Sequence, residues 1–187
     1  GYWFPDYYAD LDALLDIYQA GAPVNLIGHS MGGNVACTYA GVRPRRVARL
    51  ISLEGFGAAR TMPADAPKRY ARWLDQLVAP PRFRPYASFD AVAAHMTKNN
   101  PRLSEARARF LAQHWAQETA GGEIRLRSDP QHKIVNPVLS RIDEMLACWR
   151  SVSAPVLWVR GEASSAPGWR SDDTSRFAQR RSAFANL

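Results

Sequence analysis

The sequence predicts an α/β fold, in which a parallel sheet is interrupted by an inserted helical segment. Short apolar runs typical of buried parallel strands occur near both ends of the chain of 187 residues. Between them, from residue 58 to residue 150, apolar residues recur at three- and four-residue steps, the period of an amphipathic helix. We therefore expect a sheet core with a helical domain inserted between two of its strands.

The first predicted element is a helix over residues 6–20, where apolar side chains follow the helical period. Asp6 is a suitable N-cap residue, and a glycine and a proline soon after residue 20 predict the end of the helix. We interpret three acidic side chains of this helix as solvated: Asp10, Asp12 and Asp16.

A strand is predicted over residues 24–27 and a helix from Met31 through Ala40, with Ser30 at the turn between them. The surrounding Gly-x-Ser-x-Gly spacing lets the strand and the helix approach, because glycine has no Cβ, and it holds the serine in a strained turn. The free Met31 N–H at the start of the helix is a natural oxyanion donor. We therefore predict a nucleophile elbow, with His29 as a packing residue.

The stretch Gly28-His29-Ser30-Met31-Gly32-Gly33 resembles the α/β-hydrolase superfamily, whose members often carry the same six residues at this place. The resemblance implies a parallel-sheet α/β-hydrolase core with an inserted α-helical cap. Serine as the nucleophile distinguishes the chain from haloalkane dehalogenases and epoxide hydrolases of the same fold, which use aspartate there.

The next strand is predicted over residues 47–53 and ends at Glu54. A strand, a helix and a second parallel strand form a right-handed crossover unit. Ligands of open α/β sheets bind beyond the carboxyl ends of the strands, so Ser30 and Glu54 are expected at the functional edge.

The helical segment contains four predicted helices and no predicted strand. The helices are expected at residues 66–78, 88–97, 104–117 and 137–150, and Ser104 is a good N-cap. A further strand at 155–160 and a helix at 172–185 return to the core pattern. The resemblance therefore implies a core formed by residues 1–57 and 152–187, with a cap at 58–151.

The catalytic acid has two candidates. The family usually places it three residues after the glycine that follows the later strand, and this position is Ser164, which cannot serve. Glu54 is favoured, since some relatives use that position, and Glu162 is the alternative acid. Glu54 could instead be a loop carboxylate that accepts hydrogen bonds from nearby backbone N–H groups.

A catalytic base is not expected within the chain. The four histidines are His29, His95, His114 and His132, and the last three lie in the predicted cap. The resemblance implies a histidine beyond Leu187 and a second oxyanion donor before residue 1. We therefore expect N- and C-terminal parts of the core to be missing from this sequence.

The predicted cap supplies the candidate substrate-binding residues, His114 and Trp115. Further aromatic side chains, those of Phe89, Phe110 and Trp149, suggest a small apolar acyl or alkyl group as the ligand.

Composition argues against several other classes of function. The net charge is +7, but the arginines are scattered, so nucleic-acid binding is not expected. No apolar run approaches the roughly 18 residues of a membrane span. No zinc-type Cys/His spacing or phosphate-binding loop occurs, so neither a metal nor a cofactor is expected.

The two cysteines form no disulfide framework, Cys37 should be buried, and a cytoplasmic location is expected.

The sequence thus predicts a serine hydrolase that acts on an ester or related acyl substrate through an acyl-enzyme. The alternative is a non-catalytic hydrolase-like domain that binds a ligand or partner, which the missing base and the serine at residue 164 would explain.

Overall fold

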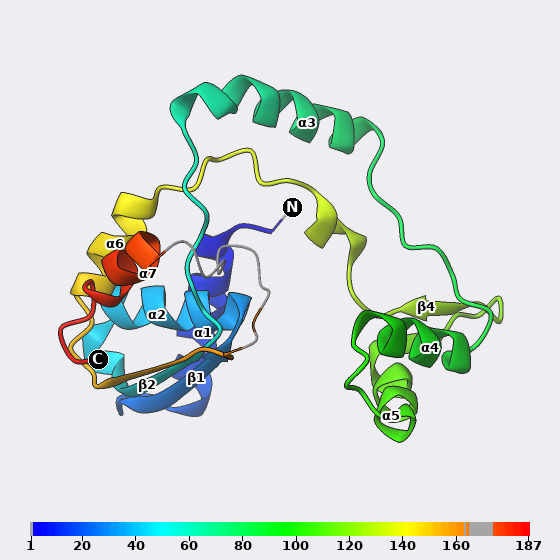
Figure 1. Cartoon of the computed structure of the whole chain (residues 1–187), viewed down its shortest axis with the longest axis horizontal. Helices are drawn as coiled ribbons and strands as arrows, with labels where there is room; N and C mark the ends of the chain where they lie inside the picture. The colour runs from blue at the N-terminus through cyan, green and yellow to red at the C-terminus, as the bar shows by residue number, and fades with distance from the viewer. Residues whose placement is uncertain (1, 163, 165–173) are drawn as a thin grey trace. The chain divides into compact units, whose positions relative to one another are not determined.

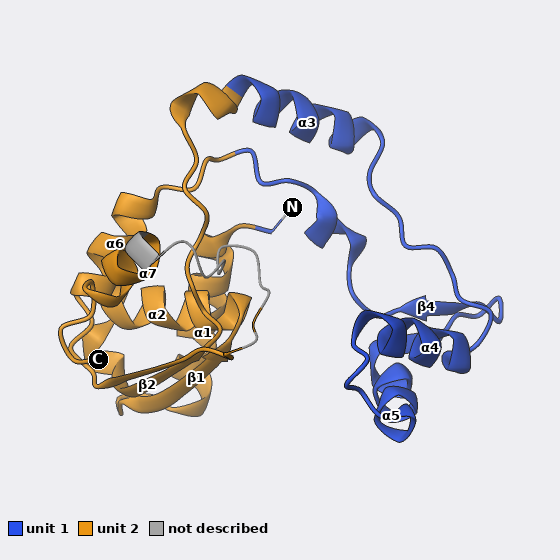
Figure 2. Cartoon of the chain, viewed as in Figure 1, with its two compact units in different colours: residues 1–2, 67–137 blue, residues 3–66, 138–187 orange. Residues whose placement is uncertain are grey.

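A computed structural model of the chain describes residues 2–162, 164 and 174–187. The chain divides into two compact units, shown in different colours in Figure 2. The larger unit comprises Trp3–Ala66 and Val138–Leu187, and the smaller unit comprises Gly1–Tyr2 and Pro67–Pro137.

The larger unit is built on a parallel sheet with the strand order β1-β2-β5. These strands are β1 (Val24–His29), β2 (Val47–Leu53) and β5 (Val156–Val159). Ile27 of β1 lies beside Ile51 of β2, which lies beside Leu157 of β5. The predicted α/β class with a parallel sheet is confirmed.

Helices α1 (Phe4–Tyr18), α2 (Met31–Val42) and α6 (Ile142–Arg150) cover one face of this sheet (Figure 1). The larger unit also contains the short helices η1 (Pro44–Arg46) and η2 (Pro63–Asp65), and α7 (Thr174–Arg181). Helix α1 begins earlier than predicted, and Asp6 lies inside its first turn, where its carboxylate accepts the Trp3 N–H at 2.9 Å. The N-cap residue is therefore Trp3, and Asp6 contributes to the cap by accepting the hydrogen bond from the Trp3 N–H.

The hydrophobic core lies between the sheet and these helices. Cys37 and Trp149 are fully buried there, and Leu50 of the central strand is 1% exposed. The predicted burial of Cys37 is confirmed. Trp149, which we expected in an apolar cap, instead belongs to this core and stacks on Phe184 with ring centroids 4.9 Å apart.

The boundary between the units differs from the sequence expectation at residues 58 and 151. Residues 138–150 belong to the larger unit, because the apolar face of α6 is buried in its core. Helix α2 packs closely on α6, since a Cβ on Gly41 would overlap the carbonyl oxygen of Cys148. Burial of this apolar face stabilises α6 in the larger unit, although α6 directly follows the helical segment in the sequence.

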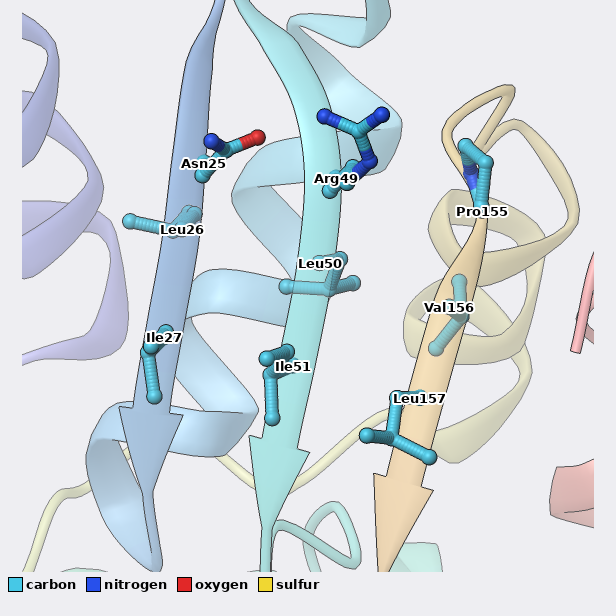
Figure 3. A pocket seen from close by; sticks show the side chains of 9 residues that line it. All are labelled: Asn25, Leu26, Ile27, Arg49, Leu50, Ile51, Pro155, Val156 and Leu157. Carbon is cyan, nitrogen blue, oxygen red and sulfur yellow. The ribbon is translucent and has the colours of Figure 1, made fainter.

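The opposite face of the sheet carries a shallow apolar groove of about 420 Å³ (Figure 3). Residues of all three strands line it: Asn25, Leu26, Ile27, Arg49, Leu50, Ile51, Pro155, Val156 and Leu157. His29 follows Ile27 by two residues, and its side chain is exposed. Its expected packing role is wrong, because an exposed side chain packs in no core.

The acidic side of α1 is not simply solvated, because two of its carboxylates bind other elements of the larger unit. Tyr39 Oη donates to Asp12 Oδ1 at 2.7 Å, and Arg43 pairs with the same carboxylate at 3.3 Å. Asp16 pairs with Arg46 in η1. Hydrogen bonds from Tyr39 and Arg43 lower the pKa of Asp12. These contacts fix α1 against α2 and η1.

We expect the buried Tyr39 phenol to make stability sensitive to alkaline pH. Burial, and then the hydrogen bond to Asp12, raise the pKa of Tyr39 to about 12 in the folded chain, against about 10 in an unfolded one. The stabilisation is therefore complete below about pH 10 and is lost as the pH rises through the folded value. Urea unfolding of the full-length protein at several pH values should show this fall, and Tyr39→Phe should reduce it. A variant of the exposed Tyr18, Tyr18→Phe, should leave the fall unchanged, and an unchanged fall in Tyr39→Phe would contradict the assignment.

The smaller unit contains a helical pair and a hairpin. Helix α3 (Ala66–Val78) leads into it and matches its predicted range. Helices α4 (Phe89–Asn99) and α5 (Glu105–Trp115) pack around Val92, Ala108 and Ala112, and the Oγ of Ser104 accepts the Arg107 N–H as a helix cap.

The expectation of no strand in this segment is wrong. Strands β3 (Ala116–Glu118) and β4 (Ile124–Leu126) form an antiparallel hairpin, which is followed by η3 (Pro130–Lys133). Each strand has only three residues, too few to show an alternating pattern. A glycine in the connection is a turn signal in the sequence, and in the structure Gly122 adopts a φ of +77° there.

Candidate active site

The backbone at Ser30 is strained. Ser30 has φ 53° and ψ −118°, a backbone conformation that residues other than glycine rarely adopt. Glu54 has φ 56°, and these two are the only residues other than glycine with positive φ among those that the structure describes. Such a conformation costs roughly 1–3 kcal/mol and persists only where the surroundings impose it.

Close packing imposes the turn at Ser30. The Ser30 N–H donates to the Leu53 carbonyl at 2.7 Å, which extends the strand ladder. A Cβ on Gly28 would overlap the Gly32 carbonyl, and one on Gly33 would lie 2.9 Å from the Gly55 Cα. Nothing lies within 4 Å of a Cβ at Gly32. Close approach therefore requires glycine at residues 28 and 33, and not at residues 28 and 32 as the motif suggests.

Helix α2 begins directly after Ser30. Met31 is its first residue, so its N–H has no intrahelical acceptor and carries the positive end of the helix dipole. The Ser30 side chain is exposed, as is that of Met31. A negatively charged oxygen near Ser30 would therefore meet a free backbone donor.

Glu54 directly follows the carboxyl end of β2, and Ser30 directly follows that of the neighbouring parallel strand β1. The Glu54 N–H donates to the Val159 carbonyl at 2.9 Å, so its backbone is tied to the end of β5. Its carboxylate accepts the Gly161 N–H with Oε1 and the Ser164 hydroxyl with Oε2, the latter at 2.7 Å. The side chain thus spans from β2 to the loop after β5.

The loop after Glu54 is held by hydrogen bonds that no sequence pattern predicts. The Trp158 Nε1 donates to the Gly55 carbonyl at 2.9 Å, and the Gly57 N–H donates to Asn34 Oδ1 at 2.6 Å. Asn34 comes from the first turn of α2, so this contact joins the turn at Ser30 to the loop at Glu54. No motif signals a single asparagine of this kind.

The alternative acid, Glu162, is exposed on the loop after β5 and has no hydrogen bond or ion pair to the part of the chain that the structure describes. It lies two residues from Ser164, whose hydroxyl contacts Glu54. The geometry therefore favours Glu54 over Glu162 as the ordered carboxylate.

The three histidines after Ser30 belong to the smaller unit, and each has neighbours there. His95 Nε2 lies 2.9 Å from the Asn99 amide nitrogen, and the His132 ring stacks on Tyr2 at 3.7 Å. The His114 ring lies 4.5 Å from that of Phe110, and Trp115 is 59% exposed at the end of α5. Within the described residues, no cluster of three or more His, Cys, Asp or Glu side chains could hold a metal ion. None of the described helices is both long enough and apolar enough to span a bilayer.

Comparisons with known proteins identify a matching family model and similar curated proteins. A family model described as alpha/beta hydrolase fold matches residues 1–182. A serine hydrolase-like protein of Danio rerio is 28% identical over 161 residues, which are 83% of this chain and 49% of the relative. A 2-(acetamidomethylene)succinate hydrolase of Mesorhizobium japonicum is 26% identical over 164 residues, which are 88% of this chain and 55% of the relative.

The fold is also that of a solved thioesterase domain from the curacin biosynthetic pathway. The TM-score is 0.79 at 24% identity, and the match covers 99% of this chain and 63% of that domain. The chain spans about half the length of the curated relatives it matches.

Proposed function

Because the chain belongs to the α/β hydrolase fold family, we propose that it forms part of a serine hydrolase that cleaves an ester or a related acyl compound. The names of two curated relatives, a serine hydrolase-like protein and a succinate-derivative hydrolase, support hydrolysis as the reaction class. The choice of serine as the nucleophile and of an acyl group as the substrate rests on the residues of this chain.

One observation carries the proposal: the only two positive-φ residues other than glycine in the described chain are Ser30 and Glu54. They follow neighbouring parallel strands at the same edge of the sheet, where ligands of such sheets bind. Strained backbone conformations cluster at catalytic sites, and here two polar residues at one edge of the sheet have such a conformation. The strand, strained serine and helix together have the geometry of a nucleophile elbow.

In the proposed reaction, Ser30 Oγ attacks the substrate carbonyl carbon and forms a tetrahedral intermediate. The Met31 N–H donates to the oxyanion. A histidine takes the Oγ proton and then gives it to the leaving group, which leaves an acyl-enzyme that water hydrolyses by the same route. The Glu54 carboxylate orients this histidine and stabilises the imidazolium while remaining ionised.

We propose that the histidine lies outside the 187 residues. The contacts of His95, His114 and His132 within the smaller unit support this, as does the coverage of only about half of the curated relatives. We further propose that the smaller unit acts as a cap, in which His114 and the exposed Trp115 contact the acyl group.

Covalent labelling of the full-length protein with a fluorophosphonate tests the proposal. Such a reagent phosphonylates an activated serine, so the adduct should map by mass spectrometry to the peptide that contains Ser30. Heat-denatured protein should not be labelled, which controls for non-specific reaction. A folded protein that remains unlabelled at Ser30 would favour the non-catalytic alternative, a hydrolase-like domain that binds a ligand or partner.

A further inference from the structure

The carboxylate of Glu54 is held by the loop after β5. Both oxygens accept hydrogen bonds from that loop, one from the Gly161 N–H and one from the Ser164 hydroxyl at 2.7 Å. A Cβ on Gly161 would lie 2.9 Å from Glu54 Oε1, so the absence of a side chain leaves room for the carboxylate. The loop thus provides two hydrogen-bond donors that fit the carboxylate of this side chain.

The backbone that presents Glu54 is fixed independently of that loop. Gly55 packs against Gly33 of α2, where a Cβ on Gly55 would lie 2.8 Å from the Gly33 Cα, and its carbonyl accepts from Trp158 Nε1. With the backbone fixed, the remaining freedom of Glu54 lies in its side-chain torsions. A glutamate side chain has three such torsions, and hydrogen bonds at both oxygens remove most of this freedom.

From this geometry we infer that Ser164 is a positioning residue for catalysis, which acts through the Glu54 carboxylate. The inference rests on the proposed function, in which Glu54 orients the catalytic histidine. An ionised carboxylate has about four acceptor positions. Gly161 and Ser164 occupy one on each oxygen, so positions remain for the N–H of an imidazole. Ser164 thereby selects the carboxylate orientation that the imidazole needs before the reaction starts.

Ser164 does not itself exchange a proton with the substrate or with Ser30. Its O–H stays with its own oxygen, and its contribution is to hold Glu54 Oε2 while the imidazole becomes positively charged. Removing the hydroxyl should therefore slow the chemical step without weakening substrate binding. A hydrogen bond to a charged group is strong enough for its loss to lower kcat by about tenfold or more.

The test measures kcat and KM for ester hydrolysis by the full-length protein with p-nitrophenyl acetate. Ser164→Ala should lower kcat about tenfold with KM unchanged, and Ser164→Thr, which keeps the hydroxyl, should restore most of the loss. Ser151→Ala is the matched control, because it removes an exposed hydroxyl of the larger unit that bonds to the Ala147 carbonyl and not to Glu54, and its kcat should equal that of the wild type.

A double-mutant cycle shows whether Ser164 acts through Glu54. Once Glu54→Ala has removed the carboxylate, adding Ser164→Ala should cause no further loss. Additive losses, or a Ser164→Ala kcat equal to that of the wild type, would overturn the inference. The proposed function fails separately, if Ser30→Ala or Glu54→Ala retains full activity.

Discussion

Replacing Ser30 with alanine is expected to lower kcat for ester hydrolysis by the full-length protein by about 10⁵-fold to 10⁶-fold. The substitution removes the oxygen that we propose as the nucleophile, and the exposed side chain makes no packing contribution that alanine would lose. Residual activity would come from the oxyanion donor and from substrate binding alone. Steady-state kinetics with p-nitrophenyl acetate measure the loss directly.

The matched control for this variant is Ser151→Ala. Ser151 is also exposed and lies in the larger unit, at the end of α6, where its hydroxyl donates to the Ala147 carbonyl. This control should keep the wild-type kcat. Equal activity of Ser30→Ala and the wild type would exclude Ser30 as the nucleophile, provided that circular dichroism shows the variant to be folded.

Replacing Gly41 with alanine should destabilise the larger unit by about 3 kcal/mol or more. The added Cβ would overlap the backbone carbonyl of Cys148, and backbone atoms cannot move aside as a flexible side chain can. Helices α2 and α6 would have to separate, which opens the core around Trp149. Thermal unfolding of the full-length protein should show a midpoint lower by roughly 6–12 °C.

Gly32→Ala provides the comparison within the same helix. A Cβ at Gly32 meets nothing within 4 Å, and alanine forms helices more readily than glycine. Its unfolding midpoint should therefore equal or exceed that of the wild type. If Gly32→Ala and Gly41→Ala lower the midpoint equally, loss of glycine in general, and not the contact with Cys148, would be the cause.

The sequence predicted the larger unit well where the signal was local. Strand β2 and helix α3 have the predicted bounds, and the turn between β1 and α2 was identified from its glycine spacing. The place of α6 was not predicted, because its amphipathic pattern shows that one face is buried and does not show against what. The same limit explains Trp149, whose aromatic side chain was assigned to the cap and lies in the larger core.

The candidate site could be predicted only in part. Ser30 follows from a motif, and Glu54 follows from the position of a strand end. The contact between Glu54 and Ser164 joins residues that are 110 positions apart, so it depends on the pairing of β2 with β5. Asn34 was missed for the same reason, since its acceptor role appears only when α2 and the loop after β2 are packed together.

The left-handed backbone at residues 30 and 54 has a consequence for directed evolution. Glycine adopts this conformation without steric cost, so a library selected only for heat resistance should enrich glycine at both positions. The survivors would be more heat-resistant proteins that lack the proposed nucleophile and the carboxylate proposed to support it. Any laboratory screen on this scaffold therefore has to score turnover and thermal tolerance together, because selection for tolerance alone removes the chemistry first.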